Sequence, residues 1–299
     1  PLDFALWKRS KEGEPWWESP WSRGRPGWHI ECSAMSTSIL GPTIDIHGGG
    51  RDLVFPHHEN EIAQSEGTYG VPFVRYWVHN GFVTIDGEKM SKSLGNFLTI
   101  RDLVKDVHPE VLRLLLISQH YRSPINFSRD SLQASTQAMV RFYEVLDRVN
   151  RCPATAPENR LTPLTGTFLE DFDQALSDDF NTPRAIALLH DLTTVLNRTL
   201  DDSPAVTAAD RDGVKGAFGK ASEVLGILEE EPAGFLESVR RSGMSATGLG
   251  ASEIEELISQ RAAARKARDF GKADGIRDML LSKGIQLKDT PEGTLWETL

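Results

Sequence analysis

The stretch HGGGRDLVFPHHENE, from His47 to Glu61, decides how the first part of this chain folds. The alternating residues 43–46 come before it and are typical of a strand, and the three glycines allow a sharp turn or a close approach to a ligand. Phe55-Pro56 then opens a helix, because proline is favoured at the first helical position. A second strand is predicted over 74–85. Strand, glycine turn, helix and strand together predict an α/β sheet domain.

Within this stretch, His57 and Glu61 are four residues apart and therefore share one face of the predicted helix. Cys32, one of only two cysteines, lies 25 residues before His57. Thiolate, imidazole and carboxylate groups are all ligands of zinc, so the three residues are a candidate metal site. A His/Glu pair at this spacing also occurs on solvated helix faces, and the pattern alone leaves both interpretations open.

The bulk composition restricts the class of protein. The chain has 299 residues, 39% of them hydrophobic and 25% charged, which is ordinary for a soluble protein of two or three domains. No apolar run approaches the roughly 20 residues of a membrane helix, and no signal peptide is visible. Two cysteines fit a reducing compartment, so we expect a cytoplasmic protein without a membrane partner. A net charge of −10 argues against a general nucleic-acid coat protein but allows a local basic patch.

A basic loop follows the second predicted strand. Asp86-Gly87 is a strong turn signal, and Lys89-Met90-Ser91-Lys92-Ser93 comes directly after it. Two lysines on such a loop can neutralise the charge of a polyphosphate during phosphoryl or nucleotidyl transfer. Taken without its context, the same pentapeptide is more often an exposed basic turn.

The remainder of the chain is predominantly helical in pattern. Residues 129–230 carry apolar stripes at helical spacing, which indicate a bundle core. Residues 231–251 contain Pro232 and four glycines and are interpreted as a linker. Residues 252–299 predict two helices and two short strands. Between Arg261 and Asp289 there are eight basic and four acidic residues. A basic helical face of this kind can bind a phosphate backbone, although a charge run is more often only a solvated face.

Taken together, these stretches resemble the cysteinyl-tRNA synthetase family of class I aminoacyl-tRNA synthetases. The similarity is carried by GWHIECSAM (27–35), HGGGRDLVFPHHENE, the KMSKS loop (89–93) and LISQHYRSPINFS (116–128), and it extends to the tail from residue 260 to 296. KMSKS marks only the class, whereas the WHIEC and HHENE contexts point to the cysteine enzyme.

The resemblance implies an α/β fold followed by an all-α region. Residues 1–128 would be the C-terminal part of a Rossmann-type catalytic domain that includes the KMSKS loop. Residues 129–230 would form the helical bundle, 231–251 the linker, and 252–299 a small α/β domain that contacts the anticodon. The implied partners are tRNA(Cys), L-cysteine and ATP with Mg²⁺, the implied cofactor is Zn²⁺, and we expect a monomer.

The resemblance also implies roles for individual residues. Cys32, His57 and Glu61 match zinc ligands. Trp28 and His47 match the wall of the amino-acid pocket, and His47 could contact the adenylate. Lys92 matches the ATP-contacting lysine of the signature loop, with Lys89 beside it at the pyrophosphate. The residues that fall where anticodon contacts are expected are Arg265, Asp274 and Asp289.

The sequence departs from the family pattern in one respect. The family has a fourth zinc ligand, a cysteine, and an HIGH-type ATP motif in its N-terminal half, and neither occurs in this sequence. Five of the seven tryptophans fall within the first 28 residues, and an aromatic segment of this kind should pack against something substantial. We therefore expect the chain to correspond to the enzyme without its N-terminal part.

Three other functions are considered. A ligase that joins cysteine to an amino-sugar would share the zinc site and the KMSKS loop, but it would not need the basic C-terminal module. A non-catalytic zinc- and RNA-binding fragment is the alternative from another functional class. A metallohydrolase with its metal bound at HHENE is the third alternative, and the sequence does not supply a complete set of metal ligands for it.

Overall fold

The computed structural model describes residues 3–89, 99–247, 251–282, 284–290 and 293–298. The chain divides into two compact units, one of residues 1–84 with 121–125 and one of residues 85–120 with 126–299. Each unit is described by itself below. In the described parts of both units, no helix combines the length and the apolar character that crossing a membrane requires.

The first unit begins with a small antiparallel pair, β1 (Trp7–Arg9) and β2 (Gly24–Pro26), followed by helix α1 (Ile30–Leu40). Gly27 is required here because a Cβ at this position would lie only 1.8 Å from the Ala5 carbonyl oxygen. Much of the tryptophan-rich segment stays exposed, with Trp21 at 76% and Trp28 at 70%.

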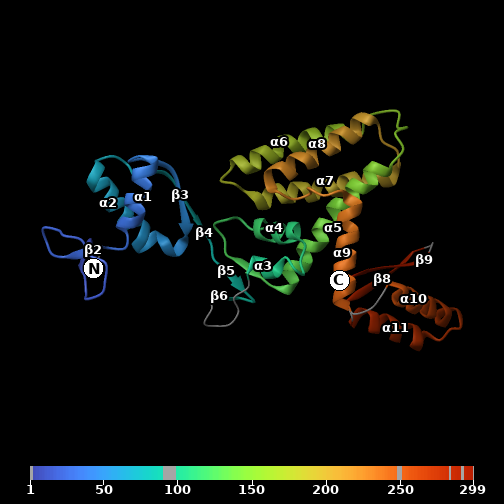
Figure 1. Cartoon of the computed structure of the whole chain (residues 1–299). Coiled ribbons are helices and arrows are strands. Elements are labelled where there is room, and N and C mark those ends of the chain that lie inside the picture. The colour runs from blue at the N-terminus through green and yellow to red at the C-terminus, as the bar shows by residue number, and fades with distance from the viewer. Residues whose placement is uncertain (1–2, 90–98, 248–250, 283, 291–292, 299) are drawn as a thin grey trace. The chain divides into compact units, whose positions relative to one another are not determined.

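A β-α-β unit forms the centre of this first unit (Figure 1). Strand β3 (Ile44–Gly50) and strand β4 (Val74–Asn80) pair in parallel, and the connection between them contains the 3₁₀ turn η1 (Arg51–Leu53), the wide helical turn η2 (Val54–His58) and helix α2 (Glu59–Tyr69). The predicted sharp turn at the three glycines is wrong, because they continue β3 and pair with residues 78–80 of β4. A parallel pair needs a crossover of this kind, and it confirms the α/β prediction.

The single strand predicted over 74–85 is two strands. β4 ends at Asn80, and β5 (Val83–Ile85) follows after Gly81, where a Cβ would meet the Ser123 carbonyl oxygen at 2.3 Å. The predicted turn at Asp86-Gly87 is confirmed, because both residues have positive φ, of 48° and 82°, as a two-residue hairpin turn requires. It leads into β6 (Glu88–Lys89), and β5 lies between β6 and β7 (Ile125–Phe127) in one sheet.

The second unit is mainly helical. It contains the short helix α3 (Ile100–Leu103), then α4 (Pro109–Ile117) and the long helix α5 (Arg129–Arg151). Ser128 caps α5, and Ser131 returns a hydrogen bond to the Ser128 backbone. The predicted apolar stripe on α5 is confirmed, with Met139, Phe142 and Val149 buried and Leu132 and Leu146 packed against the same core.

Helices α6 (Thr162–Ser177), α7 (Thr182–Asp202) and α8 (Ala208–Leu225) complete the bundle with α5. The start of α6 is held by the carboxylate of Asp210, which is fully buried. It accepts hydrogen bonds from the backbone nitrogens of Arg160, Leu161 and Thr162 at 3.1, 2.8 and 2.8 Å. Burial alone would raise the pKa of Asp210, but these hydrogen bonds lower it below its ordinary value of 3.8.

The C-terminal part departs from the sequence prediction at one place. The predicted linker 231–251 is largely helix, α9 (Pro232–Thr247), because proline is favoured at a first helical position and the apolar side chain of Phe235 is fully buried against the bundle. The module beyond it confirms the predicted two helices and two strands: α10 (Ala251–Lys266), α11 (Phe270–Ser282), and the antiparallel pair of β8 (Ile285–Thr290) and β9 (Gly293–Thr298).

Replacement of Asp210 by Asn is expected to lower the stability of the bundle by about 3 kcal/mol, because buried backbone donors lose a charged acceptor. The folded-state pKa lies below 3.8, so the carboxylate stabilises the fold fully above that pH and progressively less as the pH falls through its folded pKa. Denaturant unfolding at pH 7 and in acid should therefore show a smaller acid-induced loss for Asp210→Asn than for the wild type. The exposed Asp212→Asn on the same helix is the control, and an equal loss in both variants would contradict the prediction.

Candidate metal centre

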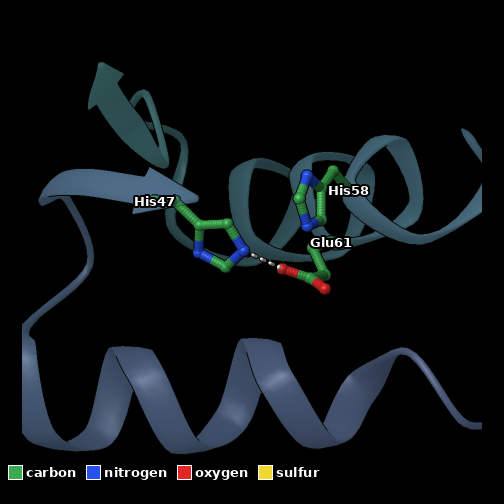
Figure 2. Close-up of side chains that lie close together, drawn as sticks. All are labelled: His47, His58 and Glu61. Carbon is green, nitrogen blue, oxygen red and sulfur yellow. Dashed lines mark ion pairs between the residues drawn. The ribbon is translucent and has the colours of Figure 1, made fainter. Parts of the chain in front are cut away.

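Three side chains that can bind a metal converge in the first unit. His47 comes from β3, His58 from η2 and Glu61 from α2, and one ligand atom of each lies within 4.8 Å of those of the other two. Figure 2 shows the His47 imidazole pointing at the Glu61 carboxylate, with the His58 ring beside them. His47 Nε2 and Glu61 Oε2 are 3.2 Å apart. His58 and Glu61 are almost fully buried, at 4% exposure each.

Gly49 provides the space for this arrangement. It pairs with His79 of β4, and a Cβ at Gly49 would lie 2.9 Å from Cε1 of His58 and 2.9 Å from Cδ1 of Leu53. Real Cβ atoms do not approach other atoms so closely. The glycine therefore allows the close approach that the sequence suggested, but the group that approaches is the His58 ring.

A further histidine orients His58. The Nδ1 atom of His58 lies 2.8 Å from Nε2 of His79, and the rings of His47 and His58 both pack on Trp77, with centroids 4.8 and 5.0 Å away. Trp77 pairs with His47 in the parallel register. A second histidine that fixes the ring of a first one resembles the outer hydrogen bonds that hold metal-binding imidazoles in place.

The electrostatics keep the imidazoles neutral. Burial, followed by the neighbouring His47 and His79, lowers the pKa of His58 to about 4. Burial likewise lowers the pKa of His47. Burial raises the pKa of Glu61, and a hydrogen bond with the Cys32 thiol acts in the opposite direction. At neutral pH the His47 and His58 rings each keep one unprotonated nitrogen, and the neutral imidazole is the form that binds a metal.

Of the predicted ligands Cys32, His57 and Glu61, only Cys32 and Glu61 interact directly, so these three are not the set that the structure gathers most tightly. Cys32 interacts with Glu61, and burial together with that carboxylate raises the pKa of the thiol. The His57 ring packs against His29, with centroids 4.8 Å apart. Within the described ranges, the set whose ligand atoms all lie within 4.8 Å of one another contains neither Cys32 nor His57. Glu61 is the residue that this set shares with the predicted set.

The two residues predicted to line the amino-acid pocket flank these ligands. Trp28 meets His57 edge to face at 5.3 Å, and His47 contacts Glu61 as described above. Sequence reasoning missed His58 and His79. The signals that could have found them were the second histidine of HHENE and the alternation in β4, which places His79 on the same face as Trp77.

The donor set fits zinc. The Glu61 Oε2 atom is buried and lies 3.2 Å from His47 Nε2, but within the part of the chain that the structure describes it has no hydrogen-bond partner. Such an oxygen is costly unless a cation or donor satisfies it. Nitrogen, sulfur and carboxylate ligands surround it, which is the chemistry that zinc prefers.

The other predicted site residues lie elsewhere. Lys89 is in β6, and Lys92 falls in residues 90–98, outside the described residues. Asp289 accepts hydrogen bonds from Arg261 at 2.7 and 2.9 Å and from Arg265 at 2.7 Å. Asp274 pairs with Arg277 at 3.3 Å instead. Of the three residues predicted to bind the anticodon, the structure therefore brings Arg265 and Asp289 together.

Comparisons with known proteins indicate the family to which this chain is similar. Residues 1–137 match the family described as "tRNA synthetases class I (C) catalytic domain", and residues 171–229 match the DALR domain. Over 99% of its length the chain is 51% identical to a cysteine–tRNA ligase of Syntrophotalea carbinolica and 50% identical to one of a Geobacter species. The chain is a relative of the class I cysteine–tRNA ligases. It spans 63% of the length of each of these two relatives.

A solved structure shows the same fold at greater distance. The LeuRS of a LeuRS–tRNA–LeuAMS complex from Agrobacterium radiobacter K84 matches 77% of this chain, and the chain covers 33% of it, with a TM-score of 0.52 and 16% identity. The matches to a class I catalytic fold and to a helical DALR domain confirm the fold class that the sequence predicted for this chain. The DALR match also lies within the predicted helical bundle.

Gly49→Ala is expected to displace the His58 ring and to destabilise the first unit by about 1–3 kcal/mol, because the new methyl group overlaps a packed imidazole. Thermal unfolding and the NMR resonances of the His58 ring would detect the change. Gly67→Ala in α2 is the control, since nothing lies within 4 Å of a Cβ there and alanine favours a helix. An unchanged His58 environment in Gly49→Ala would contradict the packing argument.

Glu61→Gln is expected to weaken zinc binding by about tenfold or more, because both candidate ligand sets use this carboxylate. Competition with a chromophoric chelator measures the affinity, and the exposed Glu59→Gln in the same helix is the control. Two double variants then identify the set: one combines Cys32→Ser with His57→Gln, and the other combines His47→Gln with His58→Gln. Only the double variant that removes ligands should reduce the affinity. Zinc affinity unaffected in Glu61→Gln would exclude both sets.

Proposed function

We propose that this chain contributes to a cysteine–tRNA ligase, which activates L-cysteine with ATP and transfers the cysteinyl group to tRNA(Cys). The observation that carries the proposal is the identity of about 50% with curated cysteine–tRNA ligases along 99% of the chain. The cluster around Glu61, which contains thiol, imidazole and carboxylate groups, supports it. In the first step the cysteine carboxylate attacks the α-phosphate of ATP, which forms cysteinyl-adenylate and releases pyrophosphate. In the second step a hydroxyl of the terminal adenosine of the tRNA attacks the carbonyl of the adenylate, which forms the ester and releases AMP.

The chain's own residues would act mainly by positioning and by charge stabilisation. Lys89 and Lys92 would neutralise the pyrophosphate. Trp28 and His47 would form the wall of the amino-acid pocket, next to His57 and Glu61 respectively. Because burial keeps His47 neutral near pH 7, it could hold the adenylate through a hydrogen bond without adding charge.

Selection of cysteine over serine is the chemical task of the metal site. An apolar pocket separates near-isosteric substrates by only about 1–3 kcal/mol. Zinc held by Glu61 with Cys32 and His57, or with His47 and His58, would supply a Lewis acid that binds the substrate thiolate far more strongly than a hydroxyl.

The C-terminal module would contact the anticodon through Arg265, Asp274 and Asp289. Asp289 is held from two sides by Arg261 and Arg265, and Arg261 in turn is almost buried, at 8% exposure. The Arg265 side chain is half exposed, at 52%, so it remains accessible to an RNA base or phosphate. The proposed domain boundaries stay at 1–128, 129–230 and 252–299, with α9 now occupying most of the segment between the last two.

Cysteine-dependent ATP–pyrophosphate exchange tests the proposal. The chain is loaded with zinc and assayed alone and together with the part of a relative that it does not span, with serine as the control amino acid. We expect exchange with cysteine in the complemented sample, no exchange with serine, and loss of activity in Lys92→Ala but not in the exposed Lys105→Ala.

The outcomes separate the candidate functions. Exchange by the chain alone would show that the family's upstream ATP motif is dispensable. No cysteine-dependent exchange in either sample, combined with binding of tRNA(Cys), would favour a non-catalytic RNA-binding role. Exchange without any tRNA binding would favour a cysteine ligase that acts on a small molecule.

A further inference from the structure

A buried polar network joins helices α4 and α5 to the turn between α8 and α9. Its centre is the Glu110 carboxylate at the start of α4, which is 7% exposed. It accepts hydrogen bonds from the Tyr143 hydroxyl of α5 at 2.8 Å and from the backbone nitrogens of Leu228 and Glu229 at 2.7 and 3.0 Å. The Tyr143 oxygen accepts a further hydrogen bond from the Glu230 nitrogen at 3.1 Å. Three successive backbone groups of the turn are thus fixed by two side chains.

The turn is held in a conformation that it would not adopt by itself. Leu228 has φ of +65°, a region that non-glycine residues rarely enter and that persists only where the surroundings impose it. Burial raises the pKa of Tyr143, so the hydroxyl remains protonated and can donate to Glu110. The turn follows the end of α8 at Gly226, and its residues Ile227 and Leu228 are buried in the core of the bundle.

Helix α9 starts directly after this turn and is seated on the same residues. The Phe235 ring stacks on Tyr143, with centroids 4.0 Å apart, and meets His108 edge to face at 4.7 Å. His108 also pairs with Glu230 at 3.1 Å. Further along α9, the guanidinium of Arg240 lies 5.1 Å from the centre of the Trp296 ring of β9. The network therefore fixes one end of a helix whose later residues contact the C-terminal module.

The length of α9 makes its start important. Sixteen residues at 1.5 Å each give a helix of about 24 Å, so a tilt of roughly 10° at the turn moves the far end by about 4 Å. A displacement of that size exceeds the length of a hydrogen bond. The position of the anticodon-contacting residues thus depends on Glu110 and Tyr143, which lie far from them in the sequence.

We propose that Glu110 and Tyr143 are positioning residues for tRNA recognition, which fix α9 and through it the C-terminal module relative to the helical bundle, so that one tRNA can contact the module and the bundle together. The proposal rests on the tRNA-binding function proposed above. Two contacts on one rigid ligand reinforce each other only when their spacing is fixed.

Two measurements on the whole chain test the proposal. The first is the distance distribution between spin labels at Glu170→Cys in α6 and Ser282→Cys in α11, in a Cys32→Ser background. The second is the affinity for complete tRNA(Cys) and for its isolated anticodon stem-loop, measured without labels. The variants are Tyr143→Phe and Glu110→Gln. The control is Val149→Ala, which removes buried volume from α5 without touching the network.

We expect Tyr143→Phe and Glu110→Gln to broaden the distance distribution and to weaken binding of complete tRNA by about fivefold or more, with the stem-loop affinity within about twofold of the wild type. Val149→Ala should change neither. Distances as narrow as in the wild type, or equal losses for both RNAs, would overturn the positioning role. A wild-type chain that binds neither RNA would refute the proposed tRNA function, whereas the distance measurement would still decide whether the network fixes α9.

Discussion

The parallel pairing of β3 with β4 is the constraint on which the candidate metal centre depends. Its register sets His47 opposite Trp77 and Gly49 opposite His79, so side chains from both strands meet on one face. The connection between the strands then returns across that face and delivers His58 and Glu61. Because Gly49 has no side chain, the His58 ring can lie directly over the sheet. A shift of one residue in this register would place His47 and His79 on opposite faces of the sheet.

The centre combines burial with an incomplete set of partners. The Glu61 carboxylate is shielded from water, yet one of its oxygens makes no hydrogen bond among the described residues. Neutral imidazoles and a thiol surround it, and each has its pKa shifted by burial toward the uncharged form. Such a site favours binding of a cation, which explains how one carboxylate could serve as a ligand in either of the two candidate sets.

Buried carboxylates have another role in the helical unit. Asp210 and Glu110 are both shielded from solvent, and both accept hydrogen bonds from backbone nitrogens of distant segments. In each case a helix start or a turn is fixed by a residue that is remote in the sequence. Asp210 joins α8 to the start of α6, whereas Glu110 joins α4 to the turn before α9. The helical unit thus obtains its long-range order from polar contacts as well as from its apolar core.

The sequence by itself determined the local elements and the class of site. Periodicity and turn residues predicted the helical bundle of 129–230, the two helices of the C-terminal module and the hairpin turn at Asp86-Gly87, because these signals act over a few residues. They were insufficient for the three glycines of β3, whose pairing partner lies 30 residues away, and for α9, whose glycines suggested a linker although Phe235 packs on Tyr143. Only the tertiary structure could place His58 and His79 beside Glu61, since a strand register and a crossover, rather than local spacing, bring these residues together.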